Sequence, residues 1–237
     1  MQPVNAIAGN LEHIRQRIDA AARTAGRSAD DIRLIAVSKR MPPESVAAAI
    51  AAGHRCFGEN TLQDAATKLQ LFDDPAIEWH FIGHLQSNKA SAVAESFDWL
   101  HTLDSVKLAT KLAAHRPQQA RPLGVLLQVN IARDPAKHGL LPEAVYSVTD
   151  ALLNTALPGI SLQGLMTIGQ QGANEAQRRA EFSALRELGA DCAIRFGREH
   201  FRELSMGMSD DFELAIAEGA TMVRVGSSIF GSREPLD

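Results

Sequence analysis

The chain has 237 residues, of which 45% are hydrophobic and 22% charged, so it can bury one large core, and its length alone does not require two domains. Its 24 basic and 28 acidic residues give a net charge of −4, and the lack of a basic block argues against nucleic acid as a partner. Charges interrupt the apolar N-terminal positions, which argues against a signal peptide or membrane span, and Cys56 and Cys192 lack a CxxC partner, so a reduced, cytoplasmic protein without structural zinc is expected.

The first predicted element is an amphipathic helix over residues 4–25, because apolar residues recur at helical spacing and Gly26 follows. After it, strands and helices alternate. The expected strands are residues 33–39, 78–83, 97–103, 123–131, 161–168 and 201–208, together with residues 54–60, which combine the second strand with a turn, and residues 221–230, which combine the eighth strand with the last loop. The expected helices between them are residues 43–52, 62–72, 87–95, 105–115, 142–154, 174–196 and 210–218, with Asp104 or Ser105 as a cap for the fourth and Ser209 for the last.

This alternation predicts a single (β/α)8 TIM barrel domain over residues 1–237, with an extra N-terminal helix. A doubly wound open sheet is the alternative, but such a sheet rarely has eight parallel strands in so short a chain. In a barrel the active site lies at the C-terminal ends of the strands, and the loops after strands seven and eight often hold a phosphate.

The first predicted strand ends in Lys39, and Pro42 and Pro43 follow almost at once. An ammonium group at the rim of an apolar core can have a lowered pKa and act as a nucleophile toward a carbonyl. The alternative is a lysine that extends its ammonium group into solvent at a strand end.

The last two predicted strands end in loops rich in glycine and serine, which contain Ser205, Gly226 and Ser227. Such loops let backbone N–H groups approach an anion, although a single pair of this kind is usually an ordinary turn. Arg224 lies within the apolar eighth strand, where a guanidinium needs a partner. That partner is either the bound molecule or an acidic neighbour such as Glu203.

Five motifs occur along the chain in a fixed order: AVSK at 36–39, FGEN at 57–60, HFIGHLQSNK at 80–89, LSMGMSDD at 204–211 and MVRVGSSIFG at 222–231. Together they resemble the YggS/PROSC family of pyridoxal 5′-phosphate (PLP) homeostasis proteins, from the first helix to about residue 231. The resemblance implies a single (β/α)8 barrel similar to the N-terminal domain of alanine racemase. The chain departs from the usual family pattern at residues 61–64 and at Arg40-Met41, and both segments lie near the expected pocket mouth.

The resemblance also implies the cofactor-binding residues. Lys39 forms the internal aldimine with PLP, and Arg224 faces the pyridine nitrogen. Ser205, Gly226 and Ser227 bind the phosphate. Asn60 lies beside the cofactor. Lys137 is expected to be a solvated loop lysine, although it matches a family position and could face the site.

The function implied is a cytoplasmic, monomeric PLP carrier or buffer that takes part in vitamin B6 homeostasis and supplies PLP-dependent apo-enzymes without catalytic turnover. Arginine does not release its proton at ordinary pH, so Arg224 cannot protonate the ring nitrogen and leaves a weak electron sink. The sequence has one tyrosine, Tyr146, in a predicted helix where packing is expected.

Two enzymatic alternatives remain open, a PLP-dependent racemase-like enzyme and an aldolase that uses Lys39 directly. His80 and His84 have the spacing of a helical metal pair, but they lie in a strand and loop without an evident third ligand, so no metal is expected.

Overall fold

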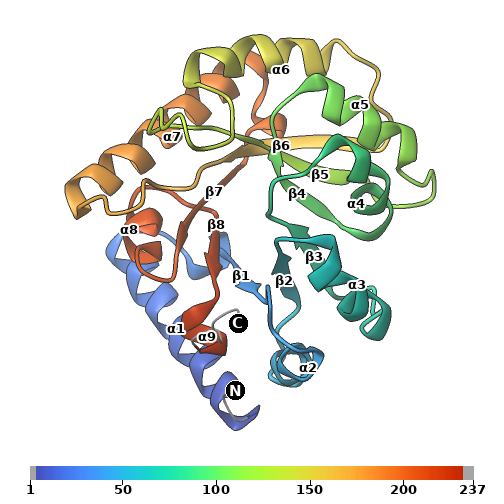
Figure 1. Cartoon of the computed structure of the whole chain (residues 1–237). Helices are drawn as coiled ribbons and strands as arrows, with labels where there is room; N and C mark the ends of the chain where they lie inside the picture. Colours follow the sequence, from blue (N-terminus) through green and yellow to red (C-terminus); the bar gives the residue numbers. More distant parts are fainter. Residues whose placement is uncertain (1–3, 232–237) are drawn as a thin grey trace.

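Eight parallel strands close into a barrel in chain order in the computed structural model, which describes residues 4–231 (Figure 1). The strands are β1 (Arg33–Val37), β2 (Cys56–Glu59), β3 (Glu78–Phe81), β4 (Trp99–Leu103), β5 (Leu123–Gln128), β6 (Ile160–Met166), β7 (Glu203–Met208) and β8 (Met222–Val225). The predicted (β/α)8 barrel is confirmed, and the open sheet is excluded because β1 pairs with β8. The ends of the predicted domain, residues 1–3 and 232–237, lie outside the described residues.

Helices follow the strands around the outside of the barrel. They are α2 (Pro43–Ala51), α3 (Leu62–Leu71), α4 (Ala90–Ser96), α5 (Val106–His115), α6 (Val145–Leu153), α7 (Glu175–Phe196), α8 (Phe212–Ala217) and the short α9 (Ser227–Phe230). The predicted cap of α5 is confirmed, because the Ser105 hydroxyl accepts a hydrogen bond from the Leu108 N–H. Residues 227–230, where the last loop was expected, form the short helix α9.

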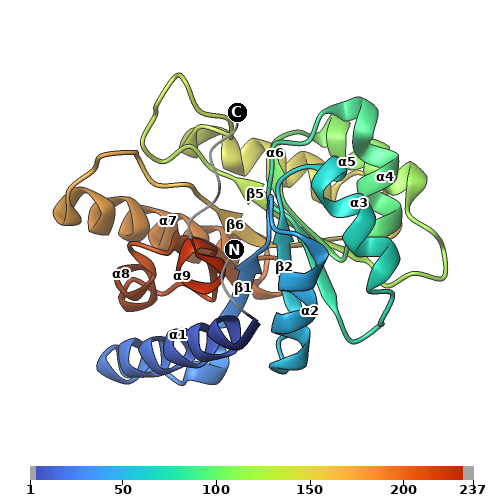
Figure 2. The same cartoon turned by 60° about the horizontal axis from the view of Figure 1, so that its bottom comes forward.

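The extra N-terminal helix is α1 (Val4–Thr24), as predicted. It packs against α8 and α9 on one side and α2 on the other (Figures 1 and 2). The Asn10 amide donates to the carbonyl of Ile229 in α9 at 2.8 Å. Because α9 is only one turn long, α1 occupies the part of the outer ring where the eighth helix of a barrel would lie. No helix among residues 4–231 is long and apolar enough to cross a membrane.

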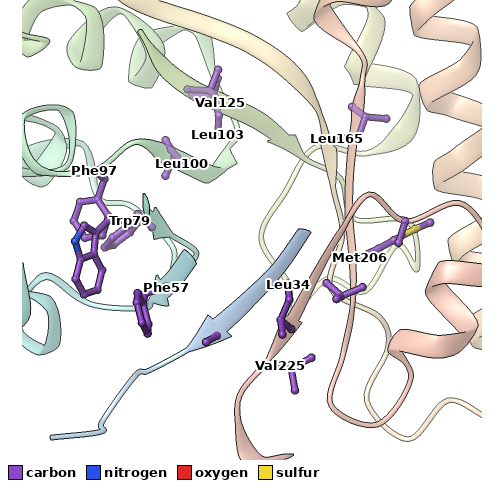
Figure 3. Packing of buried hydrophobic residues seen from close by; sticks show 14 of the residues in the cluster. Leu34, Phe57, Trp79, Phe97, Leu100, Leu103, Val125, Leu165, Met206 and Val225 are labelled. Carbon is purple, nitrogen blue, oxygen red and sulfur yellow. The ribbon is translucent and has the colours of Figure 1, made fainter. Parts of the chain in front are cut away.

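Alternating strand residues build two different layers of the core. One set packs outward beneath the helices and includes Leu34, Phe57, Trp79, Leu100, Val125, Leu165, Met206 and Val225 (Figure 3). The other set faces the barrel interior, where the apolar cluster contains only Ile35, Leu126, Met166 and Met222, with Trp99 against it. TIM barrel interiors are usually filled by layers of branched apolar residues. Here buried polar side chains share that space.

Candidate functional site

Lys39 lies two residues beyond the end of β1, at the carboxyl end of the strand and so at the mouth of the barrel. A tight turn holds it there, in which the Met41 N–H donates to the Ser38 carbonyl at 3.0 Å. The turn places Arg40 at a φ of 60°, a left-handed conformation that non-glycine residues seldom adopt. Lys39 is half-buried.

A buried ion pair between α3 and β2, which was not predicted from the sequence, supports this turn. The Lys68 ammonium on α3 donates to the Ser38 carbonyl and to Glu59 Oε1, each at 2.7 Å. The Ser38 hydroxyl donates to the same Glu59 oxygen at 2.6 Å. Burial raises the pKa of Glu59, and the charge and hydrogen bond of Lys68 and the hydrogen bond from Ser38 partly oppose this rise. The sequence signal was a glutamate in the GEN motif with a lysine nine residues later.

Strand register places the other predicted residues beside Lys39. Val37 pairs with Gly58 of β2, so Asn60 leaves the barrel next to the Lys39 turn. Ala36 pairs with Val225 of β8, so Gly226 and Ser227 leave it on the other side (Figure 1). The Asn60 segment is fixed by Gly83, where an added Cβ would lie 1.9 Å from the Asn60 carbonyl oxygen.

The loop after β7 reaches the start of the loop after β8. The Gly226 N–H donates to the Ser209 hydroxyl at 3.2 Å, so this backbone donor points at an oxygen atom. Gly207, at a φ of 89°, lies in the irregular part of β7 that leads to Ser209. The predicted N-cap role of Ser209 is wrong, because Asp211 occupies the N-cap of α8 and Ser209 instead contacts Gly226.

Arg224 is almost fully buried inside the barrel. Its guanidinium donates to the Ser205 hydroxyl at 2.5 Å and to the Thr167 carbonyl at 2.8 Å. Glu203, the alternative partner, instead accepts from the Thr221 hydroxyl at 2.6 Å. Burial lowers the pKa of Arg224 to about 10, so the guanidinium remains charged at neutral pH.

Two buried histidines extend this network across the barrel interior. His101 Nδ1 lies 2.9 Å from the Ser205 hydroxyl, and its Nε2 lies 2.9 Å from His80 Nδ1. Burial lowers the pKa of both histidines well below its ordinary value. His101 was not predicted from the sequence, and His80 was paired only with His84, whose ring stacks on that of His138 with the two centroids 3.8 Å apart. The available signal was alternation, because His80 and His101 occupy inward positions of apolar strands.

Lys137 donates from its ammonium group to the Gly169 carbonyl at 2.7 Å. It lines a cavity of 230 Å³ together with residues at the carboxyl ends of β3, β4, β5 and β6, among them Ile82, Asn130 and Ile168. The cavity lies at the same end of the barrel as Lys39. Lys137 is therefore a second amine at the mouth and not a fully solvated loop residue.

The opposite end of the barrel holds a cavity of 620 Å³ lined by Arg33, Glu78 and Trp99. Near it, side-chain atoms of Cys56, Glu78 and His80 lie within 4.8 Å of one another. Arg33 Nη1 is 3.4 Å from Glu78 Oε1, so a positive charge already faces this carboxylate and opposes a bound cation.

The chain is similar to known proteins over nearly its whole length. Residues 9–234 match the family described as alanine racemase, N-terminal domain. The chain is 43% identical over 235 residues to the pyridoxal phosphate homeostasis protein of Escherichia coli K12, with 98% of each chain covered. It is 44% identical over 231 residues to the protein of the same name from Pseudomonas aeruginosa PAO1, with 98% of this chain and 97% of that one covered.

Solved structures include PipY of Synechococcus elongatus with PLP bound, which has a TM-score of 0.82 and 36% identity and covers 95% of this chain and all of its own. Alanine racemase of Corynebacterium glutamicum, with a TM-score of 0.68 and 20% identity over 97% of this chain and 62% of its own, shares the fold. The identity to these relatives over nearly the full length of both chains establishes its family. The chain belongs to the pyridoxal phosphate homeostasis protein family, within the wider family of alanine racemase N-terminal domains.

Proposed function

We propose that this protein binds PLP and carries or buffers it for other proteins, without catalytic turnover, as part of intracellular PLP and vitamin B6 homeostasis. The observation that carries the proposal is the convergence of Lys39, Asn60 and Gly226 on neighbouring strand ends. The names of the relatives support it, since they are called pyridoxal phosphate homeostasis proteins and PipY was solved with PLP bound.

The donor set fits the chemistry of PLP, an aldehyde with a phosphate and a pyridine ring. Lys39 provides an amine that can bond to the aldehyde, and Asn60 lies beside it. Gly226 provides a backbone N–H that donates to the Ser209 hydroxyl at 3.2 Å, a contact that a phosphate oxygen would replace, and the adjoining Ser227 is an exposed residue. Bound PLP supplies electron-withdrawing chemistry, and the protein's part is to hold and orient the cofactor.

Arg224 and Ser205 complete the proposed cofactor site at the end of β8 and within β7. The buried guanidinium is held by Ser205 and Thr167, so its direction is fixed. An arginine that keeps its proton can donate a hydrogen bond to a ring nitrogen, but it does not convert that nitrogen into a strong electron-withdrawing group.

The surroundings of Tyr146 argue against racemase-like turnover, which needs a second base. Tyr146 lies on the outer helix α6, with its ring 6.5 Å from that of Phe196 and with the Arg195 guanidinium 5.4 Å from its centre. It therefore packs between helices, as the sequence predicted. We further propose that the protein works as a cytoplasmic monomer that transfers PLP to apo-enzymes.

The test is to titrate the purified protein with PLP and then assay racemisation and decarboxylation of a panel of amino acids. The proposal predicts saturable binding and no turnover above that of free PLP. It also predicts that the loaded protein reactivates a PLP-dependent apo-enzyme. Turnover that disappears in Lys39→Ala would instead support the racemase-like alternative, and failure to bind PLP would refute the proposal.

A further inference from the structure

Four buried side chains form a line through the barrel interior from β8 to β3. Arg224 Nη1 is 2.5 Å from Ser205 Oγ, and the 2.9 Å contacts from Ser205 to His101 and from His101 to His80 continue the line. At the far end, His80 Nε2 lies 3.6 Å from Glu78 Oε1. Ser205, His101 and His80 are completely inaccessible to solvent, with 0% of each residue exposed.

The donor at one end fixes the direction of the whole line. A guanidinium has only donors, so the Ser205 oxygen must accept from Arg224. Among the described residues, the only acceptor within reach of the Ser205 hydroxyl proton is His101 Nδ1, so this proton is satisfied only if His101 Nδ1 accepts it. A neutral His101 therefore carries its own proton on Nε2 and donates it to His80 Nδ1.

The other end of the line requires the same direction. Neutral His80, accepting at Nδ1, carries its proton on Nε2 and presents it to the Glu78 carboxylate. The reverse order would leave the Ser205 proton without an acceptor in the described chain. It would also turn the His80 Nε2 lone pair toward a carboxylate oxygen 3.6 Å away, at a buried nitrogen that has no hydrogen-bond partner in the described part of the structure.

We propose that Ser205, His101 and His80 are positioning residues, which orient Arg224 through a one-directional hydrogen-bond chain whose last N–H, on His80 Nε2, faces Glu78 at 3.6 Å. The inference rests on the proposed PLP function and deepens it. Ser205 acts on the cofactor through Arg224, because its single proton is committed to His101 and is not available to a phosphate. Gly226 and Ser227 are then the phosphate contacts, and their loop takes no part in the hydrogen-bond chain from Arg224 to His80.

The direction can be tested in the protein without cofactor. Nitrogen-15 NMR distinguishes the two neutral histidine tautomers, and spectra of His101→Asn and His80→Asn assign the signals. We expect both His80 and His101 to carry the proton on Nε2. A proton on Nδ1 of either ring would mean that the hydrogen bonds run in the opposite direction, and it would overturn the proposal whether or not the protein binds PLP.

The positioning role is tested by comparing PLP with pyridoxal, which lacks the phosphate. Ser205→Ala is expected to weaken the binding of both ligands by the same factor, roughly tenfold, because it disturbs the ring end of the site. Ser227→Ala should weaken PLP far more than pyridoxal. The matched control is Thr149→Val, which removes another buried hydroxyl, on α6, and should change neither affinity.

His101 provides a second variant pair with a spectroscopic readout. Asn at position 101 keeps an acceptor for Ser205, whereas Leu removes it. His101→Leu is therefore expected to shift the absorbance maximum of bound PLP, and His101→Asn to leave it close to wild type. A Ser205→Ala loss confined to PLP, or identical spectra for both His101 variants, would overturn the positioning role while leaving PLP binding by the wild type intact.

Discussion

At the scale of single residues, Lys68 decides whether the Lys39 turn keeps its shape. Its ammonium group is the partner of both Glu59 and the Ser38 carbonyl, and its side chain is only 3% exposed. Removing one member of a buried ion pair leaves the other charge without compensation. The turn would lose a carbonyl partner at the same time.

Lys68→Met is therefore expected to lower the free energy of unfolding by about 3–5 kcal/mol, measured by urea denaturation. Glu59→Gln combined with Lys68→Met should recover part of the loss, because no buried charge then remains. Glu143→Gln, which breaks an exposed pair with Arg133, is the control and should have little effect. Equal losses for Lys68→Met and the control would contradict the assignment.

Ser227 is the residue that should report on the phosphate. Its hydroxyl is exposed at the start of α9, next to the Gly226 backbone donor. A hydrogen bond to a charged group contributes about 1.5–3 kcal/mol, so Ser227→Ala should weaken PLP binding by roughly tenfold or more. Isothermal titration with PLP and pyridoxal measures the difference. Equal losses for both ligands would exclude Ser227 as a phosphate contact.

At the scale of elements, the end of β7 depends on Gly207. Its φ of 89° suits glycine, and an added Cβ would lie 2.5 Å from the Ala215 Cβ on α8. The strand can turn toward β8 only because this position lacks a side chain. Ser209 reaches the Gly226 N–H as a result.

Gly207→Ala is therefore expected to lower the free energy of unfolding by about 1–3 kcal/mol and to weaken PLP binding. Gly9→Ala is the matched control, because Gly9 lies within α1 with nothing within 4 Å of an added Cβ. That change should raise stability by up to about 1 kcal/mol. Thermal denaturation of both variants makes the comparison, and a neutral Gly207→Ala would show that the turn does not need glycine.

The elements were also where sequence reasoning succeeded most. All eight strands were predicted, because each is a short apolar run followed by turn residues. Strand ends were less accurate, since α9 begins where an extended loop was expected. The Lys39 and Gly226 loops were predicted from strand order, whereas the Lys68–Glu59 pair was not, because it depends on how α3 lies across β2. His101 was missed because its partners lie on β3 and β7, far away in sequence.

At the scale of the whole molecule, buried histidines make stability depend on pH. Burial lowers the pKa of His54 to about 4 and places those of His80 and His101 well below their ordinary value. The folded protein therefore keeps these rings neutral, while the unfolded chain binds protons near pH 6.5. Their contribution to the free energy of unfolding is present above about pH 6.5 and is lost as the pH falls toward the pKa values of the folded protein. The pKa of Glu59 is raised by burial, so this residue favours the folded protein as the pH falls, but it is one group against three histidines.

The free energy of unfolding is thus expected to fall between about pH 7.5 and pH 5, with His54 alone worth on the order of 3 kcal/mol over its full range. Urea denaturation across this range gives the slope, and His54→Asn should make it shallower. A stability that stays flat below about pH 6.5 would show that these histidines are not buried as neutral rings.

The central claim is that Lys39 is the amine that holds PLP at the mouth of this barrel. The most direct test is the absorbance spectrum of the protein loaded with PLP, before and after borohydride, followed by mapping of the trapped lysine. We predict visible absorbance that borohydride removes and a stable adduct on Lys39. Lys39→Ala should lose both features while the barrel still folds, since a lysine at a strand end buries mainly its stem. Lys137→Ala, which changes the other amine at the mouth, should retain them. An adduct on Lys137, or an unchanged spectrum in Lys39→Ala, would contradict the account.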